Sequence, residues 1–265
     1  MMRGYMNMKK RGARLGQHFL VNAHFSQVLA QAVAVREGET ILEIGPGKGA
    51  LTKELLATGA RVVAVEKDEA LVDQLKKTFA REIATGKLSI VEGDVRQFDP
   101  SGLGPYVLAA NIPYYITGEI IRQFLTDPHQ PRAAALLIQK EVAERILARD
   151  KKESLLSVSV KIYGTPRIVA KVGKGNFSPP PSVDSAILLI EHISRDFLGD
   201  TKDEDFFKIA RAGFSARRKM LGGNLANVFG KEESLRACTE AGIDPRARAE
   251  DLSLADWKRI LSRMV

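Results

Sequence analysis

The middle of the chain alternates short apolar runs with amphipathic stretches. Five runs of strand length are nearly continuous in apolar residues: TILEIG (40–45), RVVAVE (61–66), LSIVEG (88–93), YVLAAN (106–111) and AAALLI (133–138). Runs of this kind are typical of strands that are buried on both faces of a parallel sheet. The stretches between them carry apolar residues at helical spacing, and their alternation with the strands predicts right-handed βαβ units in a doubly wound α/β sheet.

Capping residues place several helix boundaries. Asn22 precedes a helical pattern ahead of the first strand, and Asp68 precedes another between the second and third strands. Gly59 is expected to end the helix that carries Leu51 and Leu55. A further helix is predicted around residues 120–125, after the fourth strand.

The segment after the fifth strand is less regular. Residues 139–164 are expected to be helical in part, although SVSVKIY (157–163) has the composition of a strand. RIVAKV (167–172) and SAILLIEHI (185–193) are predicted to be strands joined through NFSPPPSV. The simplest arrangement for these two strands is a hairpin at the sheet edge.

The character of the chain changes near residue 195. Residues 195–205 are polar and charged, which indicates a junction, and every later pattern is helical. Ser253, followed three residues later by Asp256, forms a capping-box pattern at the start of the last helix. We therefore expect a small all-helical C-terminal domain of about 70 residues.

The composition excludes several classes of protein. Hydrophobic residues make up 45% and charged residues 27% of the 265 positions, as in soluble globular proteins. A single cysteine, Cys238, excludes a disulfide framework and a thiolate zinc cluster, and it favours a cytoplasmic location. No apolar run approaches the length of a membrane span, so no membrane association is expected. The four histidines lack ligand spacing, so we expect no metal site.

Basic residues exceed acidic residues by eight, 40 against 32, and they are clustered. Residues 1–20 contain five basic side chains and no acid. A second acid-free cluster comprises Lys208, Arg211, Arg217, Arg218 and Lys219. Two such patches indicate a polyanionic partner if the fold brings them together, whereas a merely solvated surface is the alternative.

A glycine-rich loop follows the first strand and is the first candidate binding motif. Gly45, Gly47 and Gly49 allow a ligand to approach the backbone closely, and the next helix offers its N-terminal amides. The spacing also satisfies the dinucleotide fingerprint. Glu66 and Asp94, which follow the second and third strands, disfavour a pyrophosphate and suit the ribose and adenine of S-adenosylmethionine. The alternative role of these two acids is to cap helices or end strands.

The tetrad Asn111-Ile112-Pro113-Tyr114 follows the fourth strand and resembles the signature of methyltransferases that act on exocyclic amino groups. The chain from about residue 9 onward resembles the ribosomal small-subunit RNA adenine dimethyltransferase family. The motifs that carry this resemblance are the tetrad, LGQHFL (15–20), EIGPGKGALT (43–52), QKEVAERI (139–146), FSPPPSVDSA (177–186) and GFSARRKMLGGNL (213–225).

The resemblance implies a Rossmann-like class I methyltransferase sheet and a defined reaction. Methyl groups would pass from S-adenosylmethionine to N6 of two adjacent adenosines near the 3′ end of 16S rRNA in the small ribosomal subunit. Asn111 and Pro113 would accept the two N6 hydrogens through their oxygens, which makes the nitrogen a better nucleophile. Tyr114 and Phe177 would stack on the two faces of the extruded base.

The remaining expected site residues also come from the resemblance. His18 and Leu20 match cofactor-binding positions in a segment that closes over the cofactor, although many relatives have asparagine where His18 stands. Arg217, Arg218 and Lys219 would contact RNA phosphates. The implied organisation is a basic arm and closing segment (1–20), a methyltransferase domain (21–195) and a helical RNA-contacting domain (196–265), in a monomer.

Three other functions are compatible with parts of the sequence. A large-subunit rRNA adenine methyltransferase of the macrolide-resistance type shares the glycine loop and the tetrad. A non-catalytic assembly or transcription factor could use the same fold, but the intact tetrad argues against it. An NAD-dependent dehydrogenase rests on the ambiguous glycine fingerprint alone, and the sequence offers no acid or base suited to hydride transfer.

Overall fold

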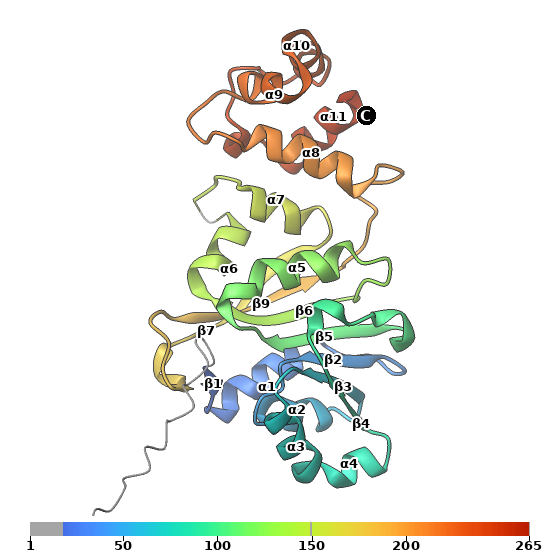
Figure 1. The fold of residues 1–265 in the computed structure, drawn as a ribbon. Helices are drawn as coiled ribbons and strands as arrows, with labels where there is room; N and C mark the ends of the chain where they lie inside the picture. The colour runs from blue at the N-terminus through green and yellow to red at the C-terminus, as the bar shows by residue number, and fades with distance from the viewer. Residues whose placement is uncertain (1–17, 149, 265) are drawn as a thin grey trace, which may run out of the picture.

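A seven-stranded sheet forms the centre of the protein, and its strand order is β4-β3-β2-β5-β6-β9-β7 (Figure 1). The computed structural model describes residues 18–148 and 150–264. The strands in spatial order are β4 (Leu88–Glu92), β3 (Arg61–Glu66), β2 (Thr40–Ile44), β5 (Tyr106–Asn111), β6 (Ala134–Gln139), β9 (Ser185–Glu191) and β7 (Thr165–Val172). The first five are parallel, and β9 runs antiparallel to both β6 and β7. The predicted doubly wound sheet and its five apolar strands are confirmed.

Helices cover both faces of the sheet, and each face has its own apolar core. On one side lie α1 (Ala23–Ala32), α2 (Ala50–Leu56), α3 (Glu69–Thr78) and α4 (Ala80–Ala84), and on the other lie α5 (Thr117–Thr126), α6 (Lys140–Leu147) and α7 (Leu155–Lys161). Both predicted caps are confirmed, because the side chain of Asn22 accepts from His24 N and that of Asp68 accepts from Ala70 N, each at 3.1 Å.

The segment SVSVKIY folds as a helix, although its composition also suited a strand. Ser154 and Ser157 form a capping box at the start of α7: the Ser154 hydroxyl accepts from Ser157 N at 3.1 Å, and the Ser157 hydroxyl accepts from Ser154 N at 2.6 Å. Val158 and Val160 are then fully buried. The cap and this burial outweigh the strand propensity of the valines.

The predicted hairpin is present at the edge of the sheet, where β9 lies next to β6 and β7 is the outer strand. The connection between its strands contains β8 (Phe177–Ser178), which pairs antiparallel with β1 (Phe19–Leu20). Phe19 lies opposite Ser178, and Leu20 lies opposite Phe177. This small second sheet joins two segments about 160 residues apart, and no sequence pattern predicted it.

In the described part of the chain, four α-helices follow the sheet and form a further layer beyond α5–α7 (Figure 1). They are α8 (Asp203–Gly213), α9 (Leu221–Phe229), α10 (Lys231–Glu240) and α11 (Leu254–Met264). The capping box of Ser253 and Asp256 at α11 is confirmed. None of the described helices combines the length and apolar character needed to span a bilayer.

The C-terminal helices share an apolar core with the sheet. One continuous cluster of buried side chains extends from strand residues such as Leu42 through α7 to Trp257 of α11. At the junction, Asp203 accepts a hydrogen bond from the Tyr163 hydroxyl at 2.7 Å and pairs with Arg195 at 2.6 Å. The position of these helices against the sheet is therefore fixed by packing as well as by the connecting segment.

Candidate active site

A cavity of ≈ 810 Å³ lies at the carboxyl ends of the parallel strands. Its wall is formed by the loops that follow β2, β3, β4 and β5, together with β1 and β8. Open α/β sheets bind their ligands at this edge, where the strand order reverses between β2 and β5. All but one of the predicted catalytic and cofactor-binding residues line the cavity: His18, Leu20, Gly45, Gly47, Glu66, Asp94, Asn111, Pro113, Tyr114 and Phe177.

The three glycines of the loop have different surroundings. Gly45 and Gly47 have φ values of +64° and +58°, a conformation that favours glycine, and both line the cavity. Gly49 is not among the lining residues. It precedes α2 with φ +83°, and a Cβ at this position would lie 2.5 Å from Cε2 of Phe79. Gly49 therefore allows the start of α2 to pack against the Phe79 ring.

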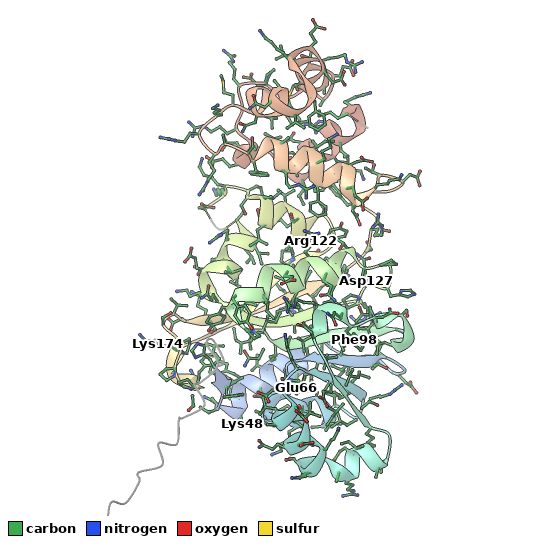
Figure 2. The ribbon with its side chains drawn as sticks, in the orientation of Figure 1. Lys48, Glu66, Phe98, Arg122, Asp127 and Lys174 are labelled. Carbon is green, nitrogen blue, oxygen red and sulfur yellow. The ribbon has the colours of Figure 1, made fainter. Side chains whose placement is uncertain are left out.

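Glu66 is held in place by backbone amides. Its Oε2 accepts from Gly47 N at 3.1 Å, and its Oε1 accepts from the amides of Lys67 and Asp68 at 2.9 Å each. Glu66 is 6% exposed and lines the cavity; Figure 2 labels it together with Lys48 of the glycine loop, which lines the cavity as well. Three fixed donors leave a preorganised carboxylate that can accept hydrogen bonds from ligand hydroxyls.

Asp94 is surrounded by cationic groups. Arg96 donates to its Oδ1 through Nε at 2.9 Å and to its Oδ2 through Nη2 at 2.5 Å, and Lys67 Nζ donates to Oδ2 at 2.8 Å. These contacts hold the pKa of the Asp94 carboxyl well below its usual range. The Arg96 backbone amide is a fourth donor, at 3.1 Å, so the four lone-pair sites of the carboxylate are filled. An adenine amino group must displace one donor, and the 68% exposed Lys67 side chain is the least constrained of them.

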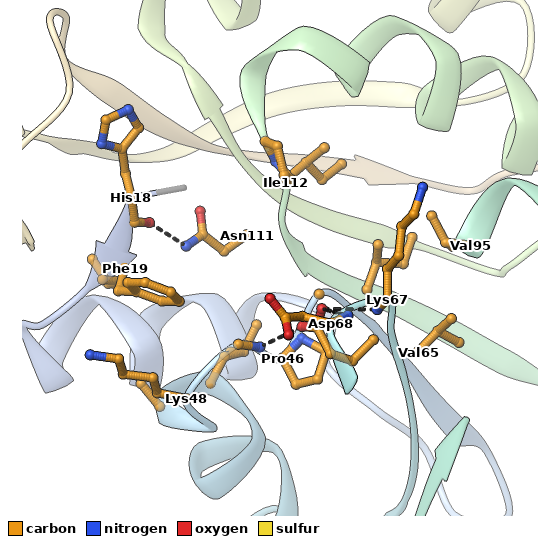
Figure 3. A pocket seen from close by; sticks show the side chains of 18 of the residues that line it. His18, Phe19, Pro46, Lys48, Val65, Lys67, Asp68, Val95, Asn111 and Ile112 are labelled. Carbon is orange, nitrogen blue, oxygen red and sulfur yellow. Dashed lines mark hydrogen bonds between the residues drawn. The ribbon is translucent and has the colours of Figure 1, made fainter. Parts of the chain in front are cut away.

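The Asn111 amide has one orientation. Its Nδ2 donates to the backbone carbonyl of His18 at 3.3 Å, and because a carbonyl can only accept, the Asn111 oxygen is left on the other side of the amide (Figure 3). Pro113 has an extended conformation with φ −55° and ψ 130°. Its carbonyl accepts from Ile116 N at 3.1 Å and keeps a second lone pair. The tetrad thus presents two oxygen acceptors at the end of β5.

Aromatic side chains from three segments meet near the tetrad. The Tyr114 hydroxyl is 2.7 Å from Ser185 Oγ, and burial raises the pKa of Tyr114. Its ring centroid is 5.9 Å from that of His18. His18 Nδ1 lies 2.8 Å from the Pro179 carbonyl, so this nitrogen carries the donated proton. Phe177, which is 4% exposed, lies on β8 in the wall of the same cavity.

Several cavity residues were not identified from the sequence. Phe19 lies over the glycine loop (Figure 3). Its ring is so close that a Cβ added at Gly47 would lie 3.0 Å from it, and Lys48 Nζ is 4.9 Å from the ring centroid. Arg96 and Tyr115 also line the cavity. The sequence hint for these two residues is their position, since Tyr115 directly follows the tetrad and Arg96 follows Asp94 by two positions. Which side chains they contact is determined by the folded structure.

A buried carboxyl lies beneath the glycine loop. Glu43, on β2 just before Gly45, is 1% exposed, and neither of its carboxyl oxygens has a hydrogen-bond partner among the described residues. Burial raises the pKa of Glu43 to about 8, with a further upward contribution from the Glu66 carboxylate, whereas Thr52 acts in the opposite direction. Glu43 is therefore mainly uncharged at neutral pH.

The predicted RNA-contacting residues lie outside this cavity. Arg217, Arg218 and Lys219 are exposed in the turn between α8 and α9. Asn224 fastens this turn, since its Nδ2 donates to the carbonyls of Gly213 at 2.7 Å and Ala216 at 3.1 Å. The basic N-terminal arm lies outside the described residues except for residues 18–20. Within residues 18–148 and 150–264, no His, Cys, Asp or Glu side chains are grouped so that they could hold a metal ion.

Comparisons with known proteins agree with one another. The family model described as "Ribosomal RNA adenine dimethylase" matches residues 8–264. A protein of Dehalococcoides mccartyi named "Ribosomal RNA small subunit methyltransferase A" is 41% identical over 266 residues, covering 98% of this chain and 90% of that protein. A protein of the same name from Thermosynechococcus vestitus is 38% identical, covering 92% of this chain and 93% of its own length.

Solved structures resemble the whole arrangement, C-terminal helices included. The crystal structure of a dimethyladenosine transferase from Plasmodium falciparum has a TM-score of 0.75 and 25% identity, covering 92% of this chain and 96% of that one. The 23S rRNA methyltransferase ErmE also has a TM-score of 0.75, at 24% identity, covering 93% and 99% of the two chains. The similarity to ErmE concerns the fold.

Proposed function

This chain belongs to the ribosomal RNA adenine dimethylase family, and from that premise we propose that it dimethylates N6 of two adjacent adenosines near the 3′ end of 16S rRNA. Ribosomal RNA is the substrate class of the family, and S-adenosylmethionine is the methyl donor. The names of the relatives support the small subunit as the target. The observation that carries the proposal is the fixed Asn111 amide at the end of β5, with its oxygen turned away from the His18 carbonyl.

The polar groups that line the cavity fit S-adenosylmethionine. Glu66 would offer its fixed carboxylate to ribose hydroxyls, and Asp94 would accept from the adenine amino group once the Lys67 side chain moves away. His18 and Leu20 of β1, with Gly45 and Gly47, would complete the enclosure. When bound, the cofactor supplies a methyl group on a positively charged sulfur, which makes that methyl group strongly electrophilic.

The protein's part in the reaction is to prepare the amine. The N6 lone pair of adenine is delocalised into the ring, so the amine is a weak nucleophile. The Asn111 oxygen and the Pro113 carbonyl would accept the two N6 hydrogens and allow the nitrogen to become pyramidal. Positioning and electrostatics of this kind supply most of the acceleration, and water can take the released proton.

Tyr114 and Phe177 would hold the extruded base between them. The Tyr114 ring is fixed by the contact of its hydroxyl with Ser185, and Phe177 is fixed by the pairing of β8 with β1. Base–aromatic stacking is worth about 1–3 kcal/mol per base, which helps to offset the cost of unstacking the target.

The C-terminal helices would orient the RNA. The exposed turn with Arg217, Arg218 and Lys219 would contact phosphates, and the basic N-terminal arm would add further contacts. We retain the division into an arm (1–20), a methyltransferase domain (21–195) and an RNA-contacting domain (196–265), a monomeric state and a cytoplasmic location as parts of this proposal.

The proposal is tested by nucleoside mass analysis. Small subunits without dimethyladenosine and naked large-subunit rRNA are each incubated with the protein and isotopically labelled S-adenosylmethionine. We expect N6,N6-dimethyladenosine in small-subunit RNA alone, and Asn111→Ala should abolish it while RNA binding persists. Labelling of large-subunit rRNA would favour the macrolide-resistance alternative, and binding without any methylation would favour an assembly factor.

A further inference from the structure

Tyr115 is an exposed aromatic side chain in the wall of the cavity. Its exposed fraction, 77%, is the highest among the large apolar side chains of the described residues. The 3₁₀ turn Tyr114–Ile116 separates consecutive side chains by about 120°. Tyr114 therefore turns inward to Ser185, Ile116 packs against the core, and Tyr115 projects outward. Single exposed apolar residues are common, so the position of this ring matters more than its exposure.

Two cationic side chains, Arg96 and Lys67, line the same cavity as Tyr115. The Arg96 guanidinium is held by Asp94. Its Nη1 makes a long contact, 3.9 Å, with Glu119, and no shorter one within the described part of the chain. The Arg96 side chain is 43% exposed and that of Lys67 is 68% exposed. An anchored guanidinium with a spare N–H donor is well suited to an RNA phosphate.

We propose that Tyr115 and Arg96 form a subsite for the nucleotide that adjoins the target adenosine. The Tyr115 ring stacks on the neighbouring base, and the Arg96 guanidinium contacts the phosphate that joins the two nucleotides. This inference rests on the proposed function, because it takes RNA as the substrate of the cavity. Aromatic platforms next to cationic side chains are the usual means of holding single-stranded nucleic acid.

The subsite also has a physical reason to exist. When an adenosine leaves its stack to enter the cavity, its neighbour loses one stacking partner. An aromatic ring at the rim replaces that partner and lowers the cost of extrusion. Tyr115 therefore binds substrate separately from Tyr114 and Phe177, which would hold the target base itself.

The test removes the ring and the neighbouring base in turn. Small subunits are reconstituted with 16S rRNA whose synthetic 3′ segment has either a normal or an abasic nucleotide on each side of the target. On the normal RNA, Tyr115→Ala should lower kcat/KM by about 5- to 150-fold, the range that corresponds to the loss of one stacked base. With the abasic nucleotide on the stacked side, wild type and Tyr115→Ala should have equal kcat/KM.

Two controls separate stacking from other effects. Tyr115→Phe keeps the ring and should stay within about twofold of wild type, since the stacking face is what counts. Val228→Ala removes another exposed apolar side chain, 51% exposed on α9 and not among the lining residues of the cavity, and should change nothing. The Kd for S-adenosylmethionine, measured without RNA by calorimetry, should be the same for Tyr115→Ala and wild type.

Three results would overturn the inference. They are an unchanged kcat/KM in Tyr115→Ala, a loss that persists with abasic nucleotides on both sides, and a matching loss of cofactor affinity. A wild-type protein that fails to methylate the normal subunits would instead contradict the proposed function, so the two failures are distinguishable.

Discussion

Glu43 gives the most quantitative prediction, because a buried carboxyl beneath the glycine loop must make stability depend on pH. In the folded protein the Glu43 pKa is about 8, against 4.5 for a free side chain, so the native state binds this proton more tightly than the unfolded state does. The free energy of unfolding should therefore fall as pH rises from 4.5 to 8 and then level off. At pH 7 the free energy of unfolding is lower than in acid by about 3 kcal/mol, because stability falls by about 1.36 kcal/mol for each pH unit above 4.5.

Glu43→Gln keeps the shape of the side chain and removes its titration. The variant should be more stable than wild type at pH 7 by about 1–2 kcal/mol, because the additional unpaired amide hydrogen takes back about 1–2 kcal/mol of the gain. For a chain of this length that is a rise in Tm of about 2–8 °C. The advantage should grow between pH 5.5 and pH 8 in urea and thermal unfolding. Parallel pH profiles for the two proteins would refute the reasoning.

Glu39 is a second glutamate near the sheet, and its pKa is shifted in the opposite direction from that of Glu43. Its carboxylate accepts from Arg132 Nε at 2.6 Å and from Arg132 Nη2 at 2.9 Å, and these hydrogen bonds lower its pKa below 4.5. Its contribution is present above pH 4.5 and is lost as pH falls through the folded-state pKa. Glu39→Gln should therefore destabilise the protein at pH 7 and have little effect in acid, where wild type has already lost the interaction.

Two other predictions concern RNA affinity and loop packing. Arg217→Ala combined with Arg218→Ala should weaken binding to small subunits and flatten its salt dependence by about two in log–log slope, with cofactor affinity unchanged; an unaltered slope would remove these residues from the RNA face. Gly49→Ala should lower stability by about 2 kcal/mol or more, because its methyl group meets the Phe79 ring. Gly59→Ala is the thermal-unfolding control, since Gly59 has φ +85° but no atom within 4 Å, and an equal loss there would mean that backbone strain alone is responsible.

The frame of the fold could be predicted from the sequence because its signals are local. The five parallel strands are marked by their own apolar runs, and the caps at Asn22, Asp68 and Ser253 act over two or three residues. The sequence pattern does not decide between helix and strand for residues 157–163, because the valines also suit a strand. The outcome depends on burial, which a local pattern does not determine.

The sequence motifs predicted which residues form the cavity, but they did not predict the charged side chains that surround Asp94. The glycine loop and the tetrad are contiguous in sequence, so their residues could be named in advance. The cations that surround Asp94 and the outward turn of Tyr115 depend on side-chain directions in the folded chain. The pairing of β1 with β8 could not be predicted either, because each of these strands has two residues, too few to show the alternation of a strand.

The uninterrupted core between the sheet and the C-terminal helices has a consequence for target choice. Because Trp257 and Leu42 belong to one packed interior, the distance from the exposed Arg217 turn to the end of β5 is rigidly set. If, as proposed, the Arg217 turn holds RNA phosphates and the end of β5 accepts the target base, this fixed distance would select adenosines by how far they lie from a docked RNA helix. The protein would then not need to read the bases in between.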